Sequence, residues 1–162
     1  MVQIQIRKAD EKDIDAIINL AHKIWHAHYP DIITVEQIKF MLATMYSRKA
    51  IDEQMQNGYT WLMALDNEQP LGFLSCNKVS DGNYFLNKLY VDTSRQRTGV
   101  GYALLSKCLQ MCDGIKTIRL QVNRKNYKAI NFYFKNGFII EDSKDFDIGN
   151  GYFMNDFVMV KK

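Results

Sequence analysis

One strand-to-helix connection near the middle of the sequence constrains the fold of this chain more than any other feature. An apolar strand over residues 84–92 runs into a basic turn that holds Gly99 and Gly101, and the turn opens a helix over residues 100–112. Glycines let a backbone approach a ligand without an intervening Cβ. The free N–H groups at a helix start carry the positive end of the helix dipole, and phosphate suits them best. The turn therefore indicates either a phosphate-bearing ligand or an ordinary strand-to-helix connection.

Two common phosphate-binding loops do not match this turn. A Walker loop needs Gly-Lys-Ser/Thr, but Gly101 is followed by Tyr102 and Ala103. A dinucleotide fingerprint needs a third glycine where Leu104 stands. It also needs a place early in a parallel unit, whereas this turn follows an antiparallel run of predicted strands. A nucleotide-dependent enzyme is therefore disfavoured.

The elements around the turn predict one α/β (α+β) domain over residues 1–162, with a mixed, largely antiparallel sheet of about seven strands flanked by helices. Asp10 with Asp13, Thr34 and Asn126 are the expected helix N-caps. Helices are expected from Asp10 to Pro30, from Thr34 to Met45, and over 47–56, 100–112 and 127–136. Strands are expected over 2–7, 59–65, 71–79, 84–92, 115–122, 138–142 and 152–160, with a turn from Asp66 to Pro70 and a loop from Ser143 to Asn150.

The bulk properties indicate a soluble cytoplasmic protein. No apolar run approaches the roughly 20 residues that span a bilayer, and the first residues lack the layout of a signal peptide. The net charge of +3 is too small for a dedicated nucleic-acid binder. A membrane or nucleic-acid partner is therefore not expected, and the protein is expected to be a monomer or a homodimer.

The cysteines are few and stand in apolar surroundings. Cys108 and Cys112 share one face of the predicted helix, but the sequence places no further metal ligand beside them. We therefore expect Cys76, Cys108 and Cys112 to be buried free thiols, with no bound metal and no disulfide.

Two motifs resemble the GNAT superfamily of N-acetyltransferases. The first is Gln96-x-x-Gly99-x-Gly101 after the strand Leu89-Tyr90-Val91, which is similar to the acetyl-CoA pyrophosphate motif of the family. The second runs from Leu120 to Phe138, where a strand is followed by Asn126, Ala129-Ile130, Tyr133 and Gly137-Phe138. The resemblance is close over residues 86–138 and covers residues 1–79 only in layout. It implies a GNAT-type fold and acetyl-CoA as the cofactor.

The resemblance also implies a set of cofactor-binding residues. Main-chain groups of the strand would bind the pantetheine arm, and amides of the turn would bind the pyrophosphate. Asn126 would contact the cofactor as well as capping its helix, and Lys135 would meet a phosphate. The implied set is Leu89, Tyr90, Val91, Gln96, Arg97, Thr98, Gly99, Val100, Gly101, Tyr102, Asn126 and Lys135.

Tyr133 matches the tyrosine that protonates the departing thiolate in this family. A phenol stays protonated near neutral pH and can donate to a developing sulfur anion. The general base is left open, because Asn87 stands where many members place a glutamate. Water relays could serve instead, or side chains from the first helices and the 143–152 loop, namely His28, Tyr29, Glu36, Asp145 and Asp147.

The acceptor is expected to be a primary amine of a small molecule. The segment from Trp25 to Tyr46 and the tail from Asp147 to Met159 resemble bacterial spermidine/spermine N-acetyltransferases, so a polyamine is the first expectation. It would bind between the first two helices and the 143–152 loop, where the expected acceptor-binding residues are His28, Tyr29, Glu36 and Asn87. Acetylation of a protein or peptide N-terminus and a non-catalytic CoA sensor remain the alternatives.

Overall fold

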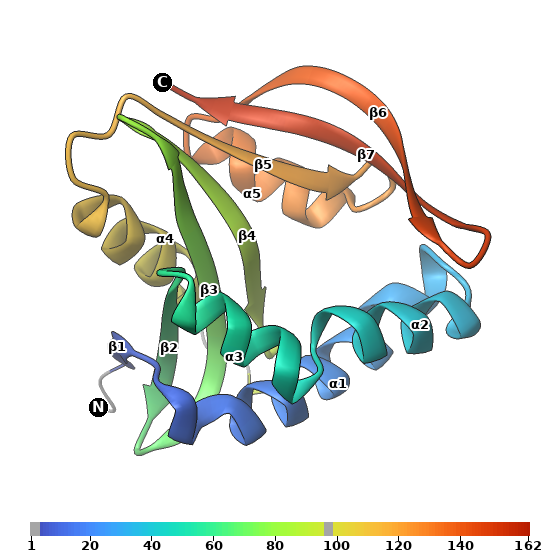
Figure 1. Cartoon of the computed structure of the whole chain (residues 1–162), viewed down its shortest axis with the longest axis horizontal. Coiled ribbons are helices and arrows are strands. Elements are labelled where there is room, and N and C mark those ends of the chain that lie inside the picture. Colours follow the sequence, from blue (N-terminus) through green and yellow to red (C-terminus); the bar gives the residue numbers. More distant parts are fainter. Residues whose placement is uncertain (1–3, 96–98) are drawn as a thin grey trace.

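The computed structural model describes residues 4–95 and 99–162, and its centre is a seven-stranded sheet. The strands lie in the order β1-β2-β3-β4-β5-β7-β6 (Figure 1). Neighbouring strands are antiparallel except β4 and β5, which are parallel. The predicted fold class is therefore confirmed. The strands are β1 (Ile4–Lys8), β2 (Thr60–Asp66), β3 (Gln69–Ser80), β4 (Asn83–Val91), β5 (Thr117–Asn123), β6 (Ile139–Gly149) and β7 (Tyr152–Lys161).

Helices cover both faces of this sheet. Helices α1 (Ile14–His28), α2 (Val35–Met45) and α3 (Arg48–Gln56) lie on one face, and α4 (Val100–Met111) and α5 (Tyr127–Lys135) on the other. Strand β2 is buried from both sides, so its side chains alternate between two cores. Trp61 and Met63 belong to the core under α1–α3, whereas Leu62 and Ala64 belong to the core under α4 and α5.

The helices begin where their capping residues predict. The Asp10 side chain accepts a hydrogen bond from Lys12 N–H, and Asp13 bonds back to the Asp10 amide, which completes the predicted capping box. Thr34 accepts from Gln37 N–H at the start of α2, and Asn126 accepts from Ala129 N–H at the start of α5. These short-range patterns fix the helices that surround the site.

Strands β4 and β5 pair only at one end and then separate. Their parallel register runs from Asn83 opposite Thr117 to Leu86 opposite Leu120, although both strands continue beyond it. Figure 1 shows the two strands diverging from that point. A β-bulge at Asn87 interrupts the pairing of β4 with β3 at the same place. Since a bulge shifts the alternation of a strand by one residue, Lys88 turns toward the α1–α3 face and not toward α4.

The structure corrects two predicted boundaries. The predicted loop from Ser143 to Asn150 is mostly strand, because β6 continues to Gly149 and pairs with β7 along its length. Strand β6 lies at the edge of the sheet, and most of its side chains are exposed. Because neither face of this strand is buried, most of its sequence does not alternate between apolar and polar residues. The turn predicted over 66–70 is a two-residue hairpin at Asn67 and Glu68, both with positive φ, so Pro70 lies inside β3.

Candidate active site

A cavity of about 590 Å³ lies against the N-terminus of α4 and is called here the cofactor cavity. Its walls come from α1, the end of β4, the start of α4 and α5. The predicted cofactor-binding residues that the structure describes all line it, namely Leu89, Tyr90, Val91, Gly99, Val100, Gly101, Tyr102, Asn126 and Lys135. Gln96, Arg97 and Thr98, predicted for the same role, lie outside the described residues. Two further lysines that the sequence did not single out, Lys23 and Lys128, line the same cavity as Lys135.

Gly99 opens α4 in a conformation that suits an approaching anion. Its φ is 80°, a left-handed value that favours glycine, and no described atom lies within 4 Å of where a Cβ would stand. The first N–H groups of a helix have no intrahelical acceptor. In α4 they face the cofactor cavity, whose lining includes Gly99, Val100 and Gly101. The start of α4 can therefore receive a phosphate group.

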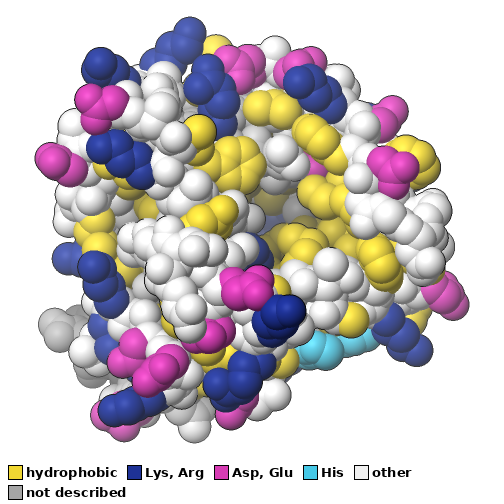
Figure 2. Space-filling view, in the orientation of Figure 1, with side chains coloured by type: hydrophobic (Ala, Val, Ile, Leu, Met, Phe, Trp, Pro, Cys, Tyr) yellow, Lys and Arg dark blue, Asp and Glu magenta, His cyan; other side chains and the backbone are white. Residues whose placement is uncertain are grey.

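A second cavity of about 390 Å³, called here the acceptor cavity, lies between α1, α2 and the separated strands β4 and β5. It is the hollow near the middle of the face in Figure 2, with hydrophobic side chains around its rim. Trp25 and Tyr29 of α1 line it, as does Asn87 at the bulge. The Asn87 amide donates to Asn77 Oδ1 at 2.7 Å, so its position is fixed by a neighbouring strand.

The two cavities meet at a shared wall. Leu89, Tyr90, Asn126, Ala129 and Tyr133 line both of them. These residues come from the end of β4 and the start of α5, the elements that carry the two sequence motifs. A ligand in each cavity would therefore be in reach of the same few side chains.

Two hydrogen bonds fix α1 against this shared wall. The His28 imidazole Nε2 lies 3.1 Å from Asn126 Oδ1, and the Tyr29 hydroxyl lies 3.0 Å from the Tyr90 hydroxyl. His28 lines the cofactor cavity, whereas Tyr29 lines the acceptor cavity, where burial raises the pKa of its phenol to about 12. Of the predicted acceptor-binding residues, the structure thus places Tyr29 and Asn87 in the acceptor cavity and His28 next to it.

Tyr133 is held in place by neighbouring rings. Its ring packs edge-on against Phe132 and Phe138, each 5.4 Å away between centroids. Among the described residues none bonds to its hydroxyl group, and burial raises the pKa of the phenol above its ordinary value. The phenol is therefore protonated at neutral pH and free to donate a hydrogen bond to a bound ligand.

The acceptor cavity is also lined by two charged side chains, Lys88 and Asp156. The sequence analysis did not single out either of them. Lys88 is 5% exposed, and its Nζ stands 5.4 Å from the ring centroids of both Tyr46 and Trp61. Burial lowers the pKa of the Lys88 ammonium to about 8. The one sign of this site in the sequence is that Lys88 is the only charged residue of β4.

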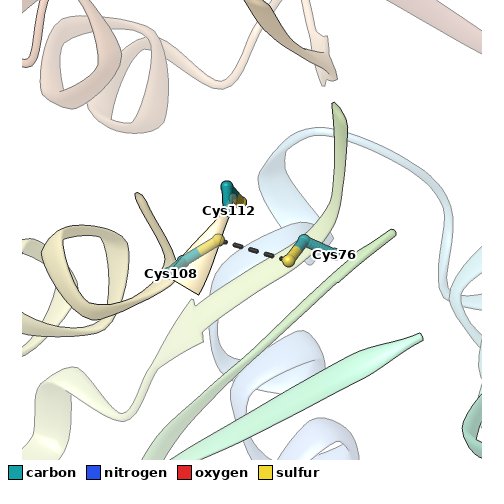
Figure 3. A group of neighbouring side chains, drawn as sticks. All are labelled: Cys76, Cys108 and Cys112. Carbon is teal, nitrogen blue, oxygen red and sulfur yellow. Dashed lines mark hydrogen bonds between the residues drawn. The ribbon is translucent and has the colours of Figure 1, made fainter. Parts of the chain in front are cut away.

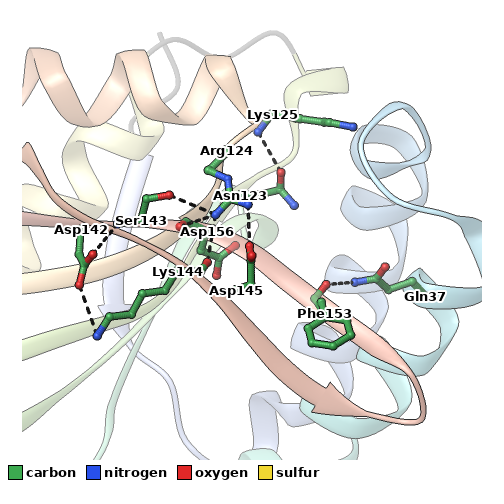
Figure 4. A network of polar contacts seen from close by, with 10 residues as sticks. All are labelled: Gln37, Asn123, Arg124, Lys125, Asp142, Ser143, Lys144, Asp145, Phe153 and Asp156. Carbon is green, nitrogen blue, oxygen red and sulfur yellow. Dashed lines mark hydrogen bonds and ion pairs between the residues drawn. The ribbon is translucent and has the colours of Figure 1, made fainter.

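Asp156 is 3% exposed and stands on β7, opposite Asn123 of β5. Burial raises the pKa of its carboxyl group to about 6, against the opposing effect of Arg124. The Arg124 guanidinium bonds to the Asp156 main-chain oxygen and to the Asp145 carboxylate, as Figure 4 shows. Asp145 is therefore occupied by an ion pair at 2.6 Å.

The remaining predicted acidic residues lie outside the acceptor cavity. Glu36, Asp145 and Asp147 are exposed, and none of them lines either cavity. Glu36 precedes Gln37, whose side chain does line the acceptor cavity and donates to Phe153 O at 2.8 Å. The structure thus brings the helix and hairpin together as predicted, but with different side chains facing inward.

The three cysteines gather in the core under α4, where Figure 3 shows Cys76 of β3 beside Cys108 and Cys112. Their sulfur atoms lie within 4.8 Å of one another, with 3.3 Å between those of Cys76 and Cys108. The thiols are buried, as predicted. The expectation that no further ligand lies near Cys108 and Cys112 is wrong, because pairing of β3 in the sheet brings Cys76 there. None of the three lines either cavity.

Comparison with known proteins identifies the class. Residues 16–138 match the Acetyltransferase (GNAT) family, and the chain belongs to that family. It is therefore an acyltransferase of the N-acetyltransferase type that uses acetyl-CoA. Within the described residues, no helix is long and apolar enough to cross a membrane.

Individual relatives agree with this assignment. The chain is 26% identical to a spermidine N(1)-acetyltransferase of Thermoplasma acidophilum, over 99% of this chain and 98% of that protein. The crystal structure of the PaiA N-acetyltransferase of Thermoplasma acidophilum with coenzyme A has a TM-score of 0.85 at 28% identity, over 99% of each chain. A peptidyl-lysine N-acetyltransferase of Salmonella typhimurium is 28% identical over 57% of this chain and 59% of its own length.

Proposed function

We propose that this protein transfers the acetyl group of acetyl-CoA directly to a primary amine of a small molecule, with Tyr133 protonating the leaving thiolate. The observation that carries the proposal is the shared wall. Tyr133 lines both the cofactor cavity and the acceptor cavity. A thioester held in one cavity and an amine held in the other would meet beside its hydroxyl group.

The lining of the cofactor cavity supports binding of the pyrophosphate and the pantetheine arm of acetyl-CoA. The pyrophosphate would lie on the first amides of α4, with Lys135 and Lys128 near its charge. The pantetheine arm would run along Leu89, Tyr90 and Val91. The separation of β4 from β5 leaves main-chain groups of this segment without a strand partner on that side among the described residues, and an amide-containing arm can pair with them.

In direct transfer, Tyr133 donates one proton and later receives one. The amine nitrogen attacks the thioester carbonyl carbon, and the carbon–sulfur bond breaks as the intermediate collapses. The thiolate then takes the phenol proton, and a proton from the new amide nitrogen restores the phenol. Placing a general acid at this position contributes roughly 10²–10⁴ in rate.

The acceptor cavity favours a small amine over a peptide. At its mouth α2 meets the β6–β7 hairpin, through the Gln37–Phe153 hydrogen bond and the contact of the Phe40 and Tyr152 rings, 5.1 Å apart. A peptide would need an open groove there. The likeness to a spermidine N(1)-acetyltransferase supports a polyamine as the acceptor. We also propose that this protein is a single domain located in the cytoplasm.

The proposal is tested by measuring thiol release from acetyl-CoA with polyamines, amino acids and short peptides side by side. We expect amine-dependent release of CoA, with the highest kcat/KM for a polyamine. Release that is fastest with peptides would favour the protein acetyltransferase alternative. Tight CoA binding without turnover on any amine would favour a sensor.

A further inference from the structure

We infer that Asp156 binds the ammonium group of the acceptor and removes its proton, so that this carboxylate is the general base of the reaction. The inference rests on the proposed function. It fills the role that Asn87 leaves vacant, because an amide at the bulge of β4 cannot accept a proton at neutral pH.

The first observation is that one oxygen of the Asp156 carboxylate, beside the acceptor cavity, is buried without a hydrogen-bond partner among the described residues. The side chain is 3% exposed and lines the cavity. Its Oδ2 atom is inaccessible to water and receives no hydrogen bond from the part of the chain that the structure describes. Buried carboxylates are normally paired or hydrogen-bonded, because an isolated buried charge is costly.

The second observation is that Arg124, whose positive charge acts on the Asp156 carboxyl group, donates its hydrogen bonds to other groups. The Arg124 guanidinium donates hydrogen bonds to the Asp145 carboxylate, to the Ser143 hydroxyl and to the main-chain oxygens of Lys144 and Asp156 (Figure 4). It therefore ties β5 to the β6–β7 hairpin and makes no hydrogen bond to the Asp156 carboxylate, which lines the cavity. An acceptor ammonium would supply the missing donor.

The register of the sheet explains why this carboxylate points to the acceptor. Asp156 pairs with Asn123 at the end of β5, beyond the point where β4 has separated. Asn123 and Asp156 both line the acceptor cavity, as do Tyr29 and Tyr133. An amine between Asp156 and Tyr133 would have its base on one side and the thioester on the other.

The proton balance of the step closes with these two residues. The bound ammonium gives one proton to the Asp156 carboxylate, and the free amine forms its bond to the acetyl carbon as described above. The second nitrogen proton returns to Tyr133 after the phenol has protonated the thiolate. The proton on Asp156 then passes to solvent when the product leaves. A carboxyl group with a pKa of about 6 is mostly ionised at neutral pH and is a stronger base than an exposed aspartate.

The charges around Asp156 set how much positive charge the cavity accepts. Arg124 acts on it from the end of β5, Asp145 from β6 and Tyr29 from the end of α1, and Lys88 lines the same cavity from β4. Among the described residues that line the cavity, Asp156 is the one carboxylate, so it can pair with one substrate ammonium. A polyamine would therefore enter with one terminal amine, and its other charges would stay toward the mouth.

The test compares Asp156→Asn with Asp145→Asn, a neighbour in the same network that does not line the cavity. Calorimetry measures spermidine binding to each protein in its complex with CoA, and thiol release measures turnover. We expect Asp156→Asn to weaken spermidine binding at least tenfold and to lower kcat/KM roughly 10²–10⁴-fold, with CoA binding unchanged. Asp145→Asn should change both by less than about threefold, as is usual for an exposed ion pair.

Stability separates a functional carboxylate from a structural one. An uncompensated carboxylate destabilises the fold above pH 6, so Asp156→Asn should keep or raise the melting temperature at pH 8, and the difference should shrink as the pH falls toward 4. Spermidine binding and turnover that survive Asp156→Asn would overturn the assignment. The assignment would also be overturned if Asp156→Asn lowered the melting temperature and abolished CoA binding, or if the wild-type protein did not bind spermidine. Wild-type turnover is scored separately: if it is absent on every amine while Asp156→Asn still abolishes spermidine binding, the proposed function fails and the ammonium site stands.

Discussion

The His28 imidazole and the Asn126 side chain lie 3.1 Å apart, and this contact ties the end of α1 to the first turn of α5. Asn126 Oδ1 also accepts a hydrogen bond from Ala129 N–H, so the same oxygen caps the helix that carries Tyr133. The helix cap and the wall shared by the two cavities thus depend on one amide group.

Replacing Asn126 should separate these two roles. Asn126→Ala removes the cap and the contact with His28, so we expect a loss of about 1 kcal/mol in the free energy of unfolding, together with weaker CoA binding. Asn126→Ser keeps a capping oxygen but is too short to reach the imidazole, so it should retain most of the stability. Chemical denaturation and CoA titration of both variants measure the difference. Equal stability of the alanine and serine variants would contradict the capping role.

Tyr133→Phe should leave cofactor binding intact and slow turnover. Loss of a general acid costs roughly 10²–10⁴ in kcat where chemistry limits the rate. Tyr84→Phe is the matched control, because the Tyr84 hydroxyl donates to Asp113 O and Tyr84 lines neither cavity. The control should turn over normally. An unchanged kcat for Tyr133→Phe would return this residue to a packing role.

Gly99→Asp should block the cofactor. The side chain would enter space that is empty in the described structure, and its charge would repel a pyrophosphate at the start of α4. We expect CoA affinity to fall by on the order of 2 kcal/mol or more. Gly99→Asn has nearly the same shape and tolerates the left-handed backbone comparably, so it isolates the effect of charge. Thermal stabilisation by CoA is the measurement, and equal shifts for wild type and the folded aspartate variant would rule out the pyrophosphate site.

Lys88→Met should stabilise the protein at neutral pH. The Lys88 ammonium has a folded pKa of about 8, below its ordinary value of 10.5. The unfolded state therefore binds more protons between those values, and the wild type gains stability as the pH rises through that window. Below pH 8 the cost of the buried charge is complete, so the variant should gain about 1–2 kcal/mol at pH 7.

The gain from Lys88→Met should disappear near pH 10.5. Lys78→Met, at an exposed lysine paired with Asp81, should show little effect at either pH. The same Lys88 variant should lower the KM for spermidine, because it removes a positive charge from the acceptor cavity. A variant that is less stable than the wild type at pH 7 would show that the two ring contacts of Lys88 outweigh its burial cost.

Features set by neighbouring residues were predictable from the sequence. The caps at Asp10, Thr34 and Asn126 each depend on a few residues, and each forms as predicted. The cofactor-cavity residues that the structure describes were implied by the resemblance of the glycine turn and the second motif to the GNAT superfamily. They lie on one strand, one turn and two helices that follow one another along the chain.

Features set by long-range pairing were not predictable. Lys88 faces the acceptor cavity because the bulge at Asn87 shifts the alternation of β4. Asp156 reaches the cavity because β7 pairs with β5 and β6 extends to Gly149, in an exposed edge strand whose pattern gives no sign of pairing. Glu36 was expected in the cavity, but the rotation of α2 directs Gln37 inward instead.

The central claim is direct transfer between two ligands bound at once, and initial rates of CoA release test it most directly. Spermidine is varied at several fixed concentrations of acetyl-CoA. Transfer within a ternary complex predicts double-reciprocal lines that intersect, and a kcat/KM for spermidine that falls as salt screens the acceptor charge. Parallel lines would indicate a covalent acetyl-enzyme, and release of CoA that does not depend on the amine would show no acceptor site at all. Either result would contradict the account.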